Sequence, residues 1–380
     1  IAEQHHRERL HRQHQRYPGD AGTDQGLQDV LQRLADNQIA QPQISGTLED
    51  LSVELVLTAH PTEVTRRTLI RKYDQMADLL SELDRSDLND DERELRRERL
   101  RRVILAAWCT DEIRREKPTP VDEAKWGFAV IENSLWQALP RFLGDLDRSL
   151  QEATGEGLPL QASPVRIASW MGGDRDGNPN VTHQVTQKVF LLGRWMAADL
   201  FLRDIKSLRA ELSMWQASGE LRGLSGDSRE PYRYVLAELR DRLIKTRDWA
   251  EARVNGDPAD SSGILFENED LTAPLELCYR SLVECGLEKI ANGALLDTIR
   301  RAHTFGLPLS RLDIRQEATR HAEAVAEMVE YLGLGDYLSW SEKERQAFLI
   351  QELQGRRPLV PRNWEPSEPV REVLDTCEVV

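Results

Sequence analysis

Three short stretches decide the predicted fold: residues 55–59 (LVLTA), 164–170 (PVRIASW) and 308–314 (PLSRLDI). They are rich in aliphatic and β-branched residues and too brief to be ordinary helices, so each is expected to be a buried strand. Each runs into a polar junction that is followed by a helical pattern. Repetition of strand, polar junction and helix is typical of a parallel α/β barrel, in which chemistry collects at the carboxyl ends of the strands.

Helical periodicity dominates the rest of the chain. A second long helix is expected to begin after Thr182, a suitable N-cap, and a shorter one is bracketed by Asn292 and Gly306. Ser341 and Glu344 form the capping box of a further helix. Another long helix, the first along the chain, is expected from Pro120 onward, because six apolar residues recur at spacings of three and four and lie on one face: Ala124, Phe128, Ile131, Leu135, Leu139 and Phe142. We therefore predict a mainly helical protein that supplies about three strands of an eight-stranded barrel, with the other strands outside this sequence.

Composition restricts the class of protein. The chain has 380 residues, of which 40% are hydrophobic and 30% charged, which fits a globular protein with a sizeable core. A net charge of -15 argues against non-specific binding to nucleic acid or to anionic membranes. There is no apolar run of about 18 residues and no apolar core for a signal peptide near the start, so we expect a cytoplasmic protein.

The cysteines and the chain ends support two smaller interpretations. No paired metal spacing occurs among the four cysteines, which we interpret as reduced thiols: Cys109, Cys278, Cys285 and Cys377. The first residue is Ile1 rather than methionine, and residues 378–380 do not resemble a natural end. We expect the sequence to be incomplete at both ends.

His60 stands at the first junction, directly after a predicted strand. Pro61 suits the first helical position, and the charge of Glu63 complements the helix dipole. A histidine in this setting can transfer a proton near neutral pH, and the adjoining helix N-terminus can bind an anion through its N–H groups. Both properties suit a phosphorylated acid as substrate. The alternative is a structural histidine that is hydrogen-bonded to a neighbouring carbonyl group.

Basic residues follow this junction on the next helical turns, namely Arg66, Arg67, Arg71 and Lys72. Guanidinium groups bind phosphate or carboxylate in a bidentate manner, so such a cluster can recruit anions to an acidic protein. The alternative is an ordinary solvated helix face. Residues 93–102 are also rich in arginine but are mixed with acidic residues, so we interpret them as intrahelical ion pairs.

The second junction, residues 169–180 (SWMGGDRDGNPN), has the highest density of polar and glycine residues. Its glycines permit close backbone approach or positive φ, and Trp170 could form the wall of a pocket. Its acidic spacing is similar to that of a calcium loop, but the sixth position is Pro179 and the twelfth is Val185, which excludes an EF-hand. The alternative is a purely structural turn.

Arg315 leaves the third predicted strand between Asp313 and Glu317. Its side chain either points toward a substrate anion or forms a structural ion pair with these acids, and the local sequence leaves both readings open. Four histidines near the start are interpreted as incidental, because no further cysteine or histidine completes a metal site: His5, His6, His11 and His14.

Five segments resemble those of bacterial phosphoenolpyruvate carboxylases: LVLTAHPTE (55–63), TDEIRR (110–115), VDEAKWGF (121–128), SWMGGDRDGNP (169–179) and DIRQE (313–317). They occur in the family's order through nearly the whole chain, which is similar to the amino-terminal half of such an enzyme. The resemblance implies that residues 1–380 are part of a single domain built on an eight-stranded barrel with many surrounding helices. It also implies a cytoplasmic homotetramer.

The resemblance further implies a reaction and residues that perform it. These enzymes carboxylate phosphoenolpyruvate with bicarbonate, through carboxyphosphate and an enolate, to give oxaloacetate and phosphate for the tricarboxylic acid cycle. His60 matches the residue that handles the proton when carbon dioxide is released. Arg315 matches an arginine that holds the phosphate, and Trp170 matches a tryptophan that lines its pocket. Arg175, in the second junction, is a further candidate for substrate binding.

A regulatory site and a cofactor are also implied. Arg66, Arg67 and Arg114 match a basic cluster that receives a phosphorylated activator in some members. The family's catalytic lysine and the ligands of its Mg²⁺ or Mn²⁺ ion belong to the carboxyl-terminal half, so we expect no metal ligand in this chain. The alternative to an active enzyme is that the isolated chain is a non-catalytic fragment.

Overall fold

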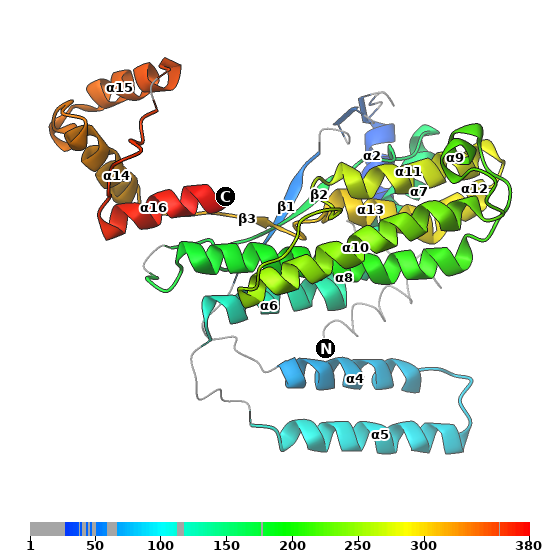
Figure 1. Cartoon of the computed structure of the whole chain (residues 1–380). Helices are drawn as coiled ribbons and strands as arrows, with labels where there is room; N and C mark the ends of the chain where they lie inside the picture. The colour runs from blue at the N-terminus through cyan, green and yellow to red at the C-terminus, as the bar shows by residue number, and fades with distance from the viewer. Residues whose placement is uncertain are drawn as a thin grey trace. The chain divides into compact units, whose positions relative to one another are not determined.

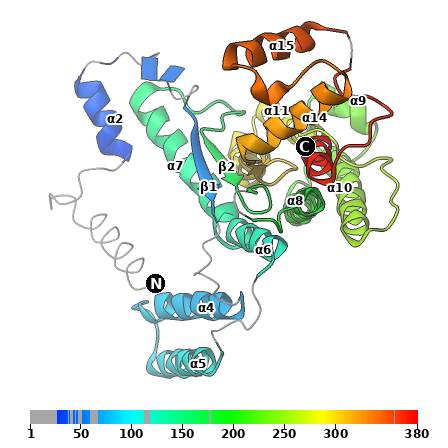
Figure 2. The same cartoon turned by 90° about the vertical axis from the view of Figure 1, so that its left-hand side faces the viewer.

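Figures 1 and 2 present the computed structural model of the chain, which falls into two compact units. The first unit comprises residues 1–40 and 59–118, and the second comprises residues 41–58 and 119–380. The structure describes the following residues: 27–37, 39, 43–44, 46–47, 51–58, 67–111, 118–175, 178–356 and 358–380.

The first unit contains a helical hairpin. The helices of this unit are α2 (Leu27–Asp36), α4 (Arg67–Leu83) and α5 (Asp90–Trp108). The hairpin consists of α4 and α5, which pack side by side (Figure 1). Arg96 Nε on α5 donates to Glu82 Oε2 on α4 at 2.8 Å. Lys72 Nζ on α4 donates to the carbonyl of Ala106 on α5 at 2.7 Å. Lys72, one of the basic residues that follow the first predicted junction, therefore links the two helices through this hydrogen bond.

The arginine-rich stretch on α5 forms ion pairs within the helix, which confirms the sequence prediction. Arg101 Nη1 lies 2.9 Å from Glu98 Oε1 and 3.1 Å from Glu94 Oε1. These side chains are largely exposed, and α5 has no buried residue. Exposed pairs of this kind contribute little to stability, so α5 is held mainly by its capping box at Asn89 and by contact with α4.

The second unit is mainly helical around a small parallel sheet. Its strands are β1 (Val53–Leu57), β2 (Val165–Ser169) and β3 (Arg311–Leu312). Its helical elements up to β3 are α6 (Pro120–Val130), η1 (Ile131–Leu135), α7 (Trp136–Thr154), α8 (His183–Glu211), α9 (Gly219–Ser225), α10 (Pro231–Asn255), α11 (Glu269–Glu284), α12 (Glu288–Ile290), η2 (Ala291–Leu295) and α13 (Leu296–Thr304). After β3 follow α14 (Ala318–Tyr331), η3 (Tyr337–Ser339), α15 (Glu342–Gln354) and α16 (Glu368–Val379).

The three predicted strands pair in parallel in the order β1-β2-β3. Val53 is opposite Val165 and Leu57 is opposite Ser169, whereas β3 adds a short pairing of Ser169 with Leu312. Parallel pairing brings the three carboxyl ends to one edge of the sheet, as the sequence predicted. The described residues thus form a mainly helical protein with a three-stranded parallel sheet.

The prediction that all three strands are buried is wrong for β1 and β3. Four of the five residues of β1 are exposed, and Val53, Leu55 and Val56 are 44%, 42% and 37% exposed. In β3, Arg311 is exposed and Leu312 is half-buried, whereas the interior strand β2 is buried at every position except Arg166. The difference arises because β1 and β3 are the edge strands, and no described element covers the aliphatic side chains of β1.

The helix predicted from residue 120 is a rod of α6, η1 and α7 that is interrupted by a five-residue π-helix. Up to Ile131 the predicted apolar face is buried, and beyond η1 Leu139 is buried as predicted, but Phe142 is 48% exposed. The buried face of α7 also contains Trp136 and Leu143, one position beyond the predicted Leu135 and Phe142. A π-turn absorbs one extra residue in the helical ladder, so the buried stripe continues one position later in the sequence.

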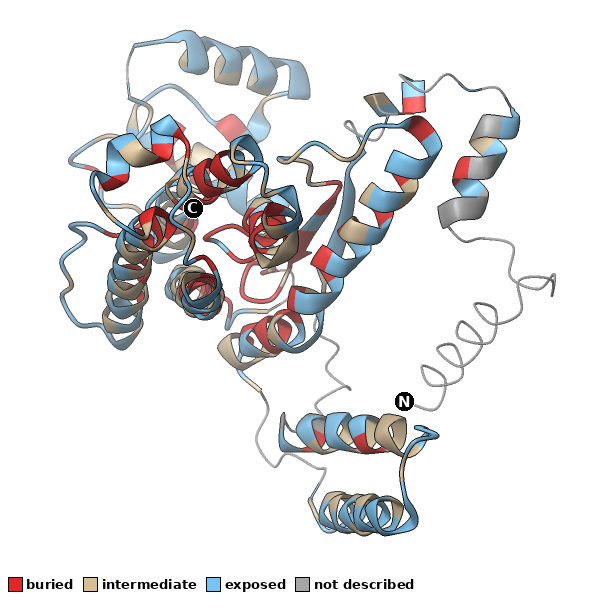
Figure 3. Ribbon diagram, turned by 90° about the vertical axis from the view of Figure 1, so that its right-hand side faces the viewer, coloured by how far each residue is buried: buried red, intermediate tan, exposed pale blue. Residues whose placement is uncertain are grey.

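Buried residues of the second unit lie along its helices and on its sheet (Figure 3). Three of its residues, from α7, α8 and α13, are joined by hydrogen bonds. Trp136 stacks on Phe305, with ring centroids 5.0 Å apart, and its Nε1 donates to Asp204 Oδ2 at 3.2 Å. Arg301 Nη1 donates to the same Asp204 oxygen at 2.9 Å. We call Trp136, Asp204 and Arg301 the buried triad.

Arg301 uses its other nitrogens as well. Nε donates to the Trp136 carbonyl at 2.7 Å and Nη2 to Gln137 Oε1 at 3.1 Å. All three guanidinium nitrogens are therefore paired, as a charged group in a core requires. Burial raises the pKa of Asp204, although Arg301 and Trp136 oppose that shift.

Several local predictions are confirmed. Thr182 caps α8 by accepting from the Val185 N–H, Ser341 and Glu344 form the capping box of α15, and Gly306 has a positive φ of 57°.

The four cysteines are free thiols in the structure, and burial raises the pKa of the Cys278 thiol to about 12. Among the described helices, none combines the length and the hydropathy that a membrane span requires.

Candidate active site

Main-chain hydrogen bonds join the carboxyl ends of the strands. The Trp170 N–H donates to the Leu57 carbonyl at 3.2 Å, and the Asp313 N–H donates to the Ser169 carbonyl at 2.9 Å. Beyond the strands, Arg315 N–H donates to the Gly173 carbonyl at 3.0 Å. The second and third junctions are thus a continuation of the sheet, which fixes their side chains relative to one another.

Two glycines make this close approach feasible. Gly172 has a φ of +83°, which disfavours any residue with a Cβ. A Cβ on Gly173 would lie 2.2 Å from the Asp313 carbonyl oxygen, which is far inside van der Waals contact. The two predicted roles of these glycines are thus divided: Gly172 adopts the positive φ, and Gly173 allows the close approach of the second and third junctions.

Trp170, Asp313 and Arg315 meet at this edge, and we call them the exposed triad. Trp170 Nε1 donates to Asp313 Oδ2 at 2.9 Å, and Arg315 Nη2 donates to the same oxygen at 3.2 Å. The Arg315 guanidinium carbon lies 3.7 Å from the centroid of the Trp170 ring, a close cation–π stack. Both candidates that the resemblance associates with phosphate binding are brought together by the fold.

Arg175 is in a different environment from Arg315. It is 7% exposed, and Nη1 donates to the Gly173 carbonyl at 3.1 Å. Nη2 donates to Thr186 Oγ1 at 2.7 Å and to Thr376 Oγ1 at 3.1 Å, which ties the second junction to α8 and α16. Desolvation by burial lowers its pKa, while the charge of Glu372 opposes that shift. Its contacts are those of a structural link, and its predicted role in substrate binding stays a prediction.

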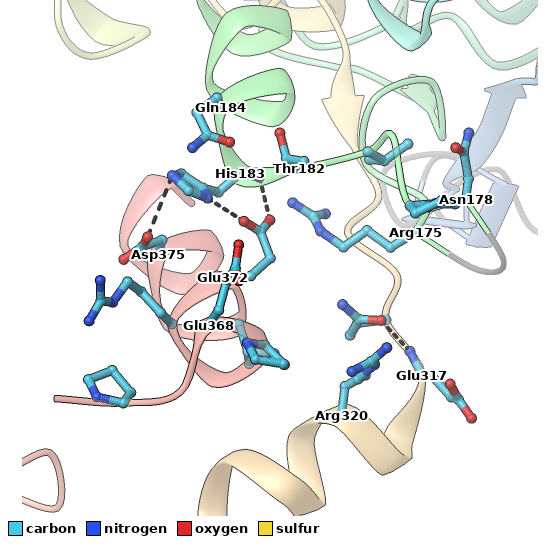
Figure 4. Close-up of a pocket in the computed structure, with 17 residues that line it drawn as sticks. Arg175, Asn178, Thr182, His183, Gln184, Glu317, Arg320, Glu368, Glu372 and Asp375 are labelled. Carbon is cyan, nitrogen blue, oxygen red and sulfur yellow. Dashed lines mark hydrogen bonds and ion pairs between the residues drawn. The ribbon is translucent and has the colours of Figure 1, made fainter.

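A cleft of about 1020 Å³ opens beside Arg175 (Figure 4). His183, the first residue of α8, projects into it: its backbone N–H and its Nδ1 each lie 2.5 Å from an oxygen of Glu372, and its Nε2 lies 3.5 Å from Asp375 Oδ2. Both cationic side chains and carboxylates line the cleft, so it differs from an anion-binding site, whose lining is mainly cationic. The charged side chains that line it are Arg175, Arg320, Arg371, Glu317, Glu368, Glu372 and Asp375.

The sequence reasoning did not single out His183 or the double hydrogen bond to Asp313. The sequence does place His183 directly after the N-cap Thr182, at the first position of α8, where its backbone N–H has no partner within the helix. Its partners Glu372 and Asp375, however, are almost 200 residues away in the sequence, and no local pattern connects them.

Other predicted residues lie outside the described part of the chain. This holds for His60, Arg66 and Arg114, and Arg67 begins α4 with a side chain that is not described. Arg71 is exposed on α4. Within the described ranges, no group of three or more His, Cys, Asp or Glu side chains has the arrangement of a metal site.

Comparison with known proteins identifies the family. The family model for phosphoenolpyruvate carboxylase matches residues 1–380. Similar relatives that carry this name occur in Marinobacter nauticus (73% identical over 380 residues), Alcanivorax borkumensis (65% over 384) and Pseudomonas aeruginosa (55% over 380). Each alignment covers all of this chain but 43% of the relative, so the chain spans less than half the length of these proteins. The chain belongs to the phosphoenolpyruvate carboxylase family.

Proposed function

We propose that the protein to which this chain belongs carboxylates phosphoenolpyruvate with bicarbonate to form oxaloacetate and inorganic phosphate. The observation that carries the proposal is the exposed triad. It presents a stacked, half-exposed guanidinium at the carboxyl ends of parallel strands, where such folds place their chemistry. The match of the whole chain to the family adds the reaction.

Arg315 binds the phosphate of phosphoenolpyruvate in this proposal. A bicarbonate oxygen attacks the phosphorus, the bond from phosphorus to the enol oxygen breaks, and carboxyphosphate and the enolate of pyruvate result. His60 accepts the carboxyl proton of carboxyphosphate, which then splits into carbon dioxide and phosphate. The enolate carbon attacks carbon dioxide to form oxaloacetate. Trp170 forms the apolar wall that holds Arg315 in place and limits access of water to the enolate.

The complete protein is proposed to close an eight-stranded barrel. Two observations support this. Among the described residues, the outer strands β1 and β3 each have one edge that pairs with no other strand, and β1 exposes Val53, Leu55 and Val56. Further strands beside β1 would pair its open edge and cover these side chains. We extend the proposal to a homotetramer in the cytoplasm that supplies oxaloacetate to the tricarboxylic acid cycle.

The divalent metal that the family uses, Mg²⁺ or Mn²⁺, would polarise the anionic substrate. The described residues do not fit such an ion, because they include no cluster of three or more suitable ligands. We propose that its ligands and the catalytic lysine come from the part of the protein outside this chain. Arg66, Arg67 and Arg114 remain candidates for binding a phosphorylated activator, which makes the protein allosteric in this proposal.

Replacement of His60 tests the function. His60→Asn in the full-length protein should reduce oxaloacetate formation by at least about 10³-fold, because an amide cannot accept the proton at neutral pH. Circular dichroism and thermal unfolding should match the wild type. His321→Asn, the same change at an exposed histidine of α14, is the matched control and should retain full turnover. Wild-type turnover by His60→Asn would contradict the assignment.

A second candidate is that the isolated chain is a non-catalytic fragment. The open sheet and the lack of a metal cluster in the described ranges favour it. The purified 380 residues, supplied with phosphoenolpyruvate, bicarbonate and Mg²⁺, should form no oxaloacetate. Measurable turnover would show that the catalytic groups are all within this chain.

A further inference from the structure

Asp313 holds the exposed triad together through a single oxygen. Its Oδ2 accepts from Trp170 Nε1 at 2.9 Å and from Arg315 Nη2 at 3.2 Å. The carboxylate therefore touches both residues that the proposed function assigns to the phosphate, without itself being suited to bind an anion. A negative charge beside an anion site repels the ligand, so its presence there needs a compensating benefit.

The backbone fixes this carboxylate in position. The Asp313 N–H is bonded to the Ser169 carbonyl, and the Asp313 carbonyl lies against Gly173, where no side chain fits. Two residues further along, Arg315 forms an isolated bridge with Asp174, and its N–H donates to the Gly173 carbonyl. Asp313, directly after β3, is thus a rigid reference point for the indole of Trp170, directly after β2.

The flexible member of the triad is Arg315. Its side chain is 46% exposed, and within the described part of the chain its guanidinium donates only to Asp313. An exposed arginine loses substantial rotamer entropy when it binds a ligand. The Asp313 bond on one edge and the Trp170 stack on one face restrict the guanidinium plane before any ligand arrives, and they leave the other N–H groups available.

The buried triad provides a structural contrast with the same three residue types. There Asp204 Oδ2 also accepts from a tryptophan Nε1 and from an arginine, but every nitrogen of Arg301 is paired with protein. Arg301 therefore has no nitrogen to offer to a ligand. In the exposed triad, by contrast, only Nη2 of the Arg315 guanidinium donates to a described residue, so its other N–H groups are available to a ligand.

From this geometry we propose that Asp313 is a positioning residue, which holds Arg315 flat against Trp170 so that its free edge receives the phosphate of the substrate. The inference rests on the proposed function of Arg315. The competing role is charge neutralisation, in which Asp313 only weakens the field of the arginine. The two roles predict opposite signs: loss of Asp313 weakens phosphoenolpyruvate binding if it positions Arg315, and strengthens it if it neutralises Arg315.

The test uses the full-length protein with Mg²⁺ and without bicarbonate, so that phosphoenolpyruvate binds without turnover and calorimetry measures its Kd. Asp313→Ala should raise Kd by about 10–100-fold, the usual cost of losing an orienting partner. Asp313→Asn should raise it by less than about 3-fold, because the amide oxygen still accepts both hydrogen bonds. Rescue by asparagine separates positioning from charge, and thermal unfolding of both variants, expected at the wild-type midpoint, shows that each of them folds.

A double-mutant cycle tests whether Asp313 acts through Arg315. In an Arg315→Ala background, Asp313→Ala should change Kd by less than about 2-fold, because no guanidinium remains to be oriented. The matched control is Asp204→Asn in the buried triad, which should lower the thermal midpoint and leave Kd unchanged. An Asp313→Ala protein that binds more tightly, or one whose loss is undiminished in the Arg315→Ala background, would overturn the inference.

Oxaloacetate formation, measured in parallel with bicarbonate present, separates this inference from the proposed function. If the wild type turns over but the cycle is additive, the positioning role alone fails. If the wild type neither binds nor carboxylates phosphoenolpyruvate, the proposed function fails and the inference fails with it. If Arg315→Ala binds as the wild type does, the role of Arg315 is wrong and positioning is overturned as well.

Discussion

Two triads of tryptophan, aspartate and arginine occur among the described residues of the second unit, and they differ in the exposure of their charged side chains. In the buried triad, the side chains of Arg301 and Asp204 are 8% and 17% exposed, whereas those of Arg315 and Asp313 in the exposed triad are 46% and 45% exposed. In both, one carboxylate oxygen accepts from the indole and from the guanidinium. The motif itself is therefore not diagnostic of function. What distinguishes the two is whether the remaining guanidinium donors are consumed by the protein.

This difference separates the contributions to stability from those to binding. A buried pair becomes very costly when one partner is lost, because the other charge stays in the core without compensation. An exposed pair contributes little to stability, but its arginine can reach a ligand. Each triad should thus respond to substitution in a different assay.

The largest effect is expected from the buried triad. Arg301→Met should lower the free energy of unfolding by about 3–5 kcal/mol, since it leaves Asp204 and the Trp136 carbonyl without their partner in the core. Thermal and urea unfolding of the full-length protein measure this loss. The Kd for phosphoenolpyruvate of the folded protein should stay unchanged. A loss of affinity with unaltered stability would break the comparison.

The next effect concerns the shape of the cation in the exposed triad. Arg315→Lys keeps the charge but loses the planar fork that stacks on Trp170 and that, in the proposed function, binds phosphate at two points. We expect Kd for phosphoenolpyruvate to rise by about 10-fold and the thermal midpoint to stay within about 1 °C of the wild type, because the pair is exposed. Wild-type affinity in the lysine variant would show that charge alone matters.

A smaller effect should appear in the pH dependence of stability. Burial raises the pKa of Asp204 above its usual value of about 4, so the unfolded chain releases this proton at a lower pH than the folded protein does. The wild type should therefore lose stability relative to Asp204→Asn as the pH rises from about 4 through the raised pKa. Urea midpoints of both proteins between pH 4 and pH 7 measure the difference. If the urea midpoint of the wild type instead rises relative to that of Asp204→Asn over this pH range, the pKa of Asp204 is not raised in the folded protein.

The smallest effect is expected for the stability contribution of Asp313. Asp313→Asn should change the free energy of unfolding by less than about 0.5 kcal/mol, since the exposed ion pair is solvated in both proteins. Urea unfolding under the same conditions as for Arg301→Met provides the measurement. A loss comparable to that of Arg301→Met would mean that the exposed triad is a structural element.

The sequence predicted those features that depend on neighbouring residues. The strands, their parallel pairing, the N-cap at Thr182 and the capping box at Ser341 are confirmed because local pattern determines each of them. The burial of β1 and β3 was predicted wrongly, since an aliphatic run does not reveal whether a neighbouring element covers it.

The features that were missed depend on contacts between distant segments. Trp136 and Asp204 are 68 positions apart, and Asp204 and Arg301 are 97 apart, so no spacing rule connects the buried triad. For the candidate site, the sequence named Trp170 and Arg315, which the structure brings together, but not the shared oxygen of Asp313. The proposed role of His60 stays a prediction, because that residue lies outside the described part of the chain.

The π-turn η1 also affects how the length of the rod can vary between relatives. Deletion of one residue within η1 would restore regular α-helical geometry and leave α7 with the same face toward the core, because the five residues of the π-turn complete about the same rotation as four residues of an α-helix. Leu143 would then stay in the core, and Phe142 would stay outside it. Insertions and deletions are usually tolerated in loops, where the chain absorbs them. Here the π-turn absorbs one extra residue inside a helix, so this rod should tolerate a change of one residue in length at η1, whereas a deletion elsewhere in α7 would rotate every residue after it by about 100°.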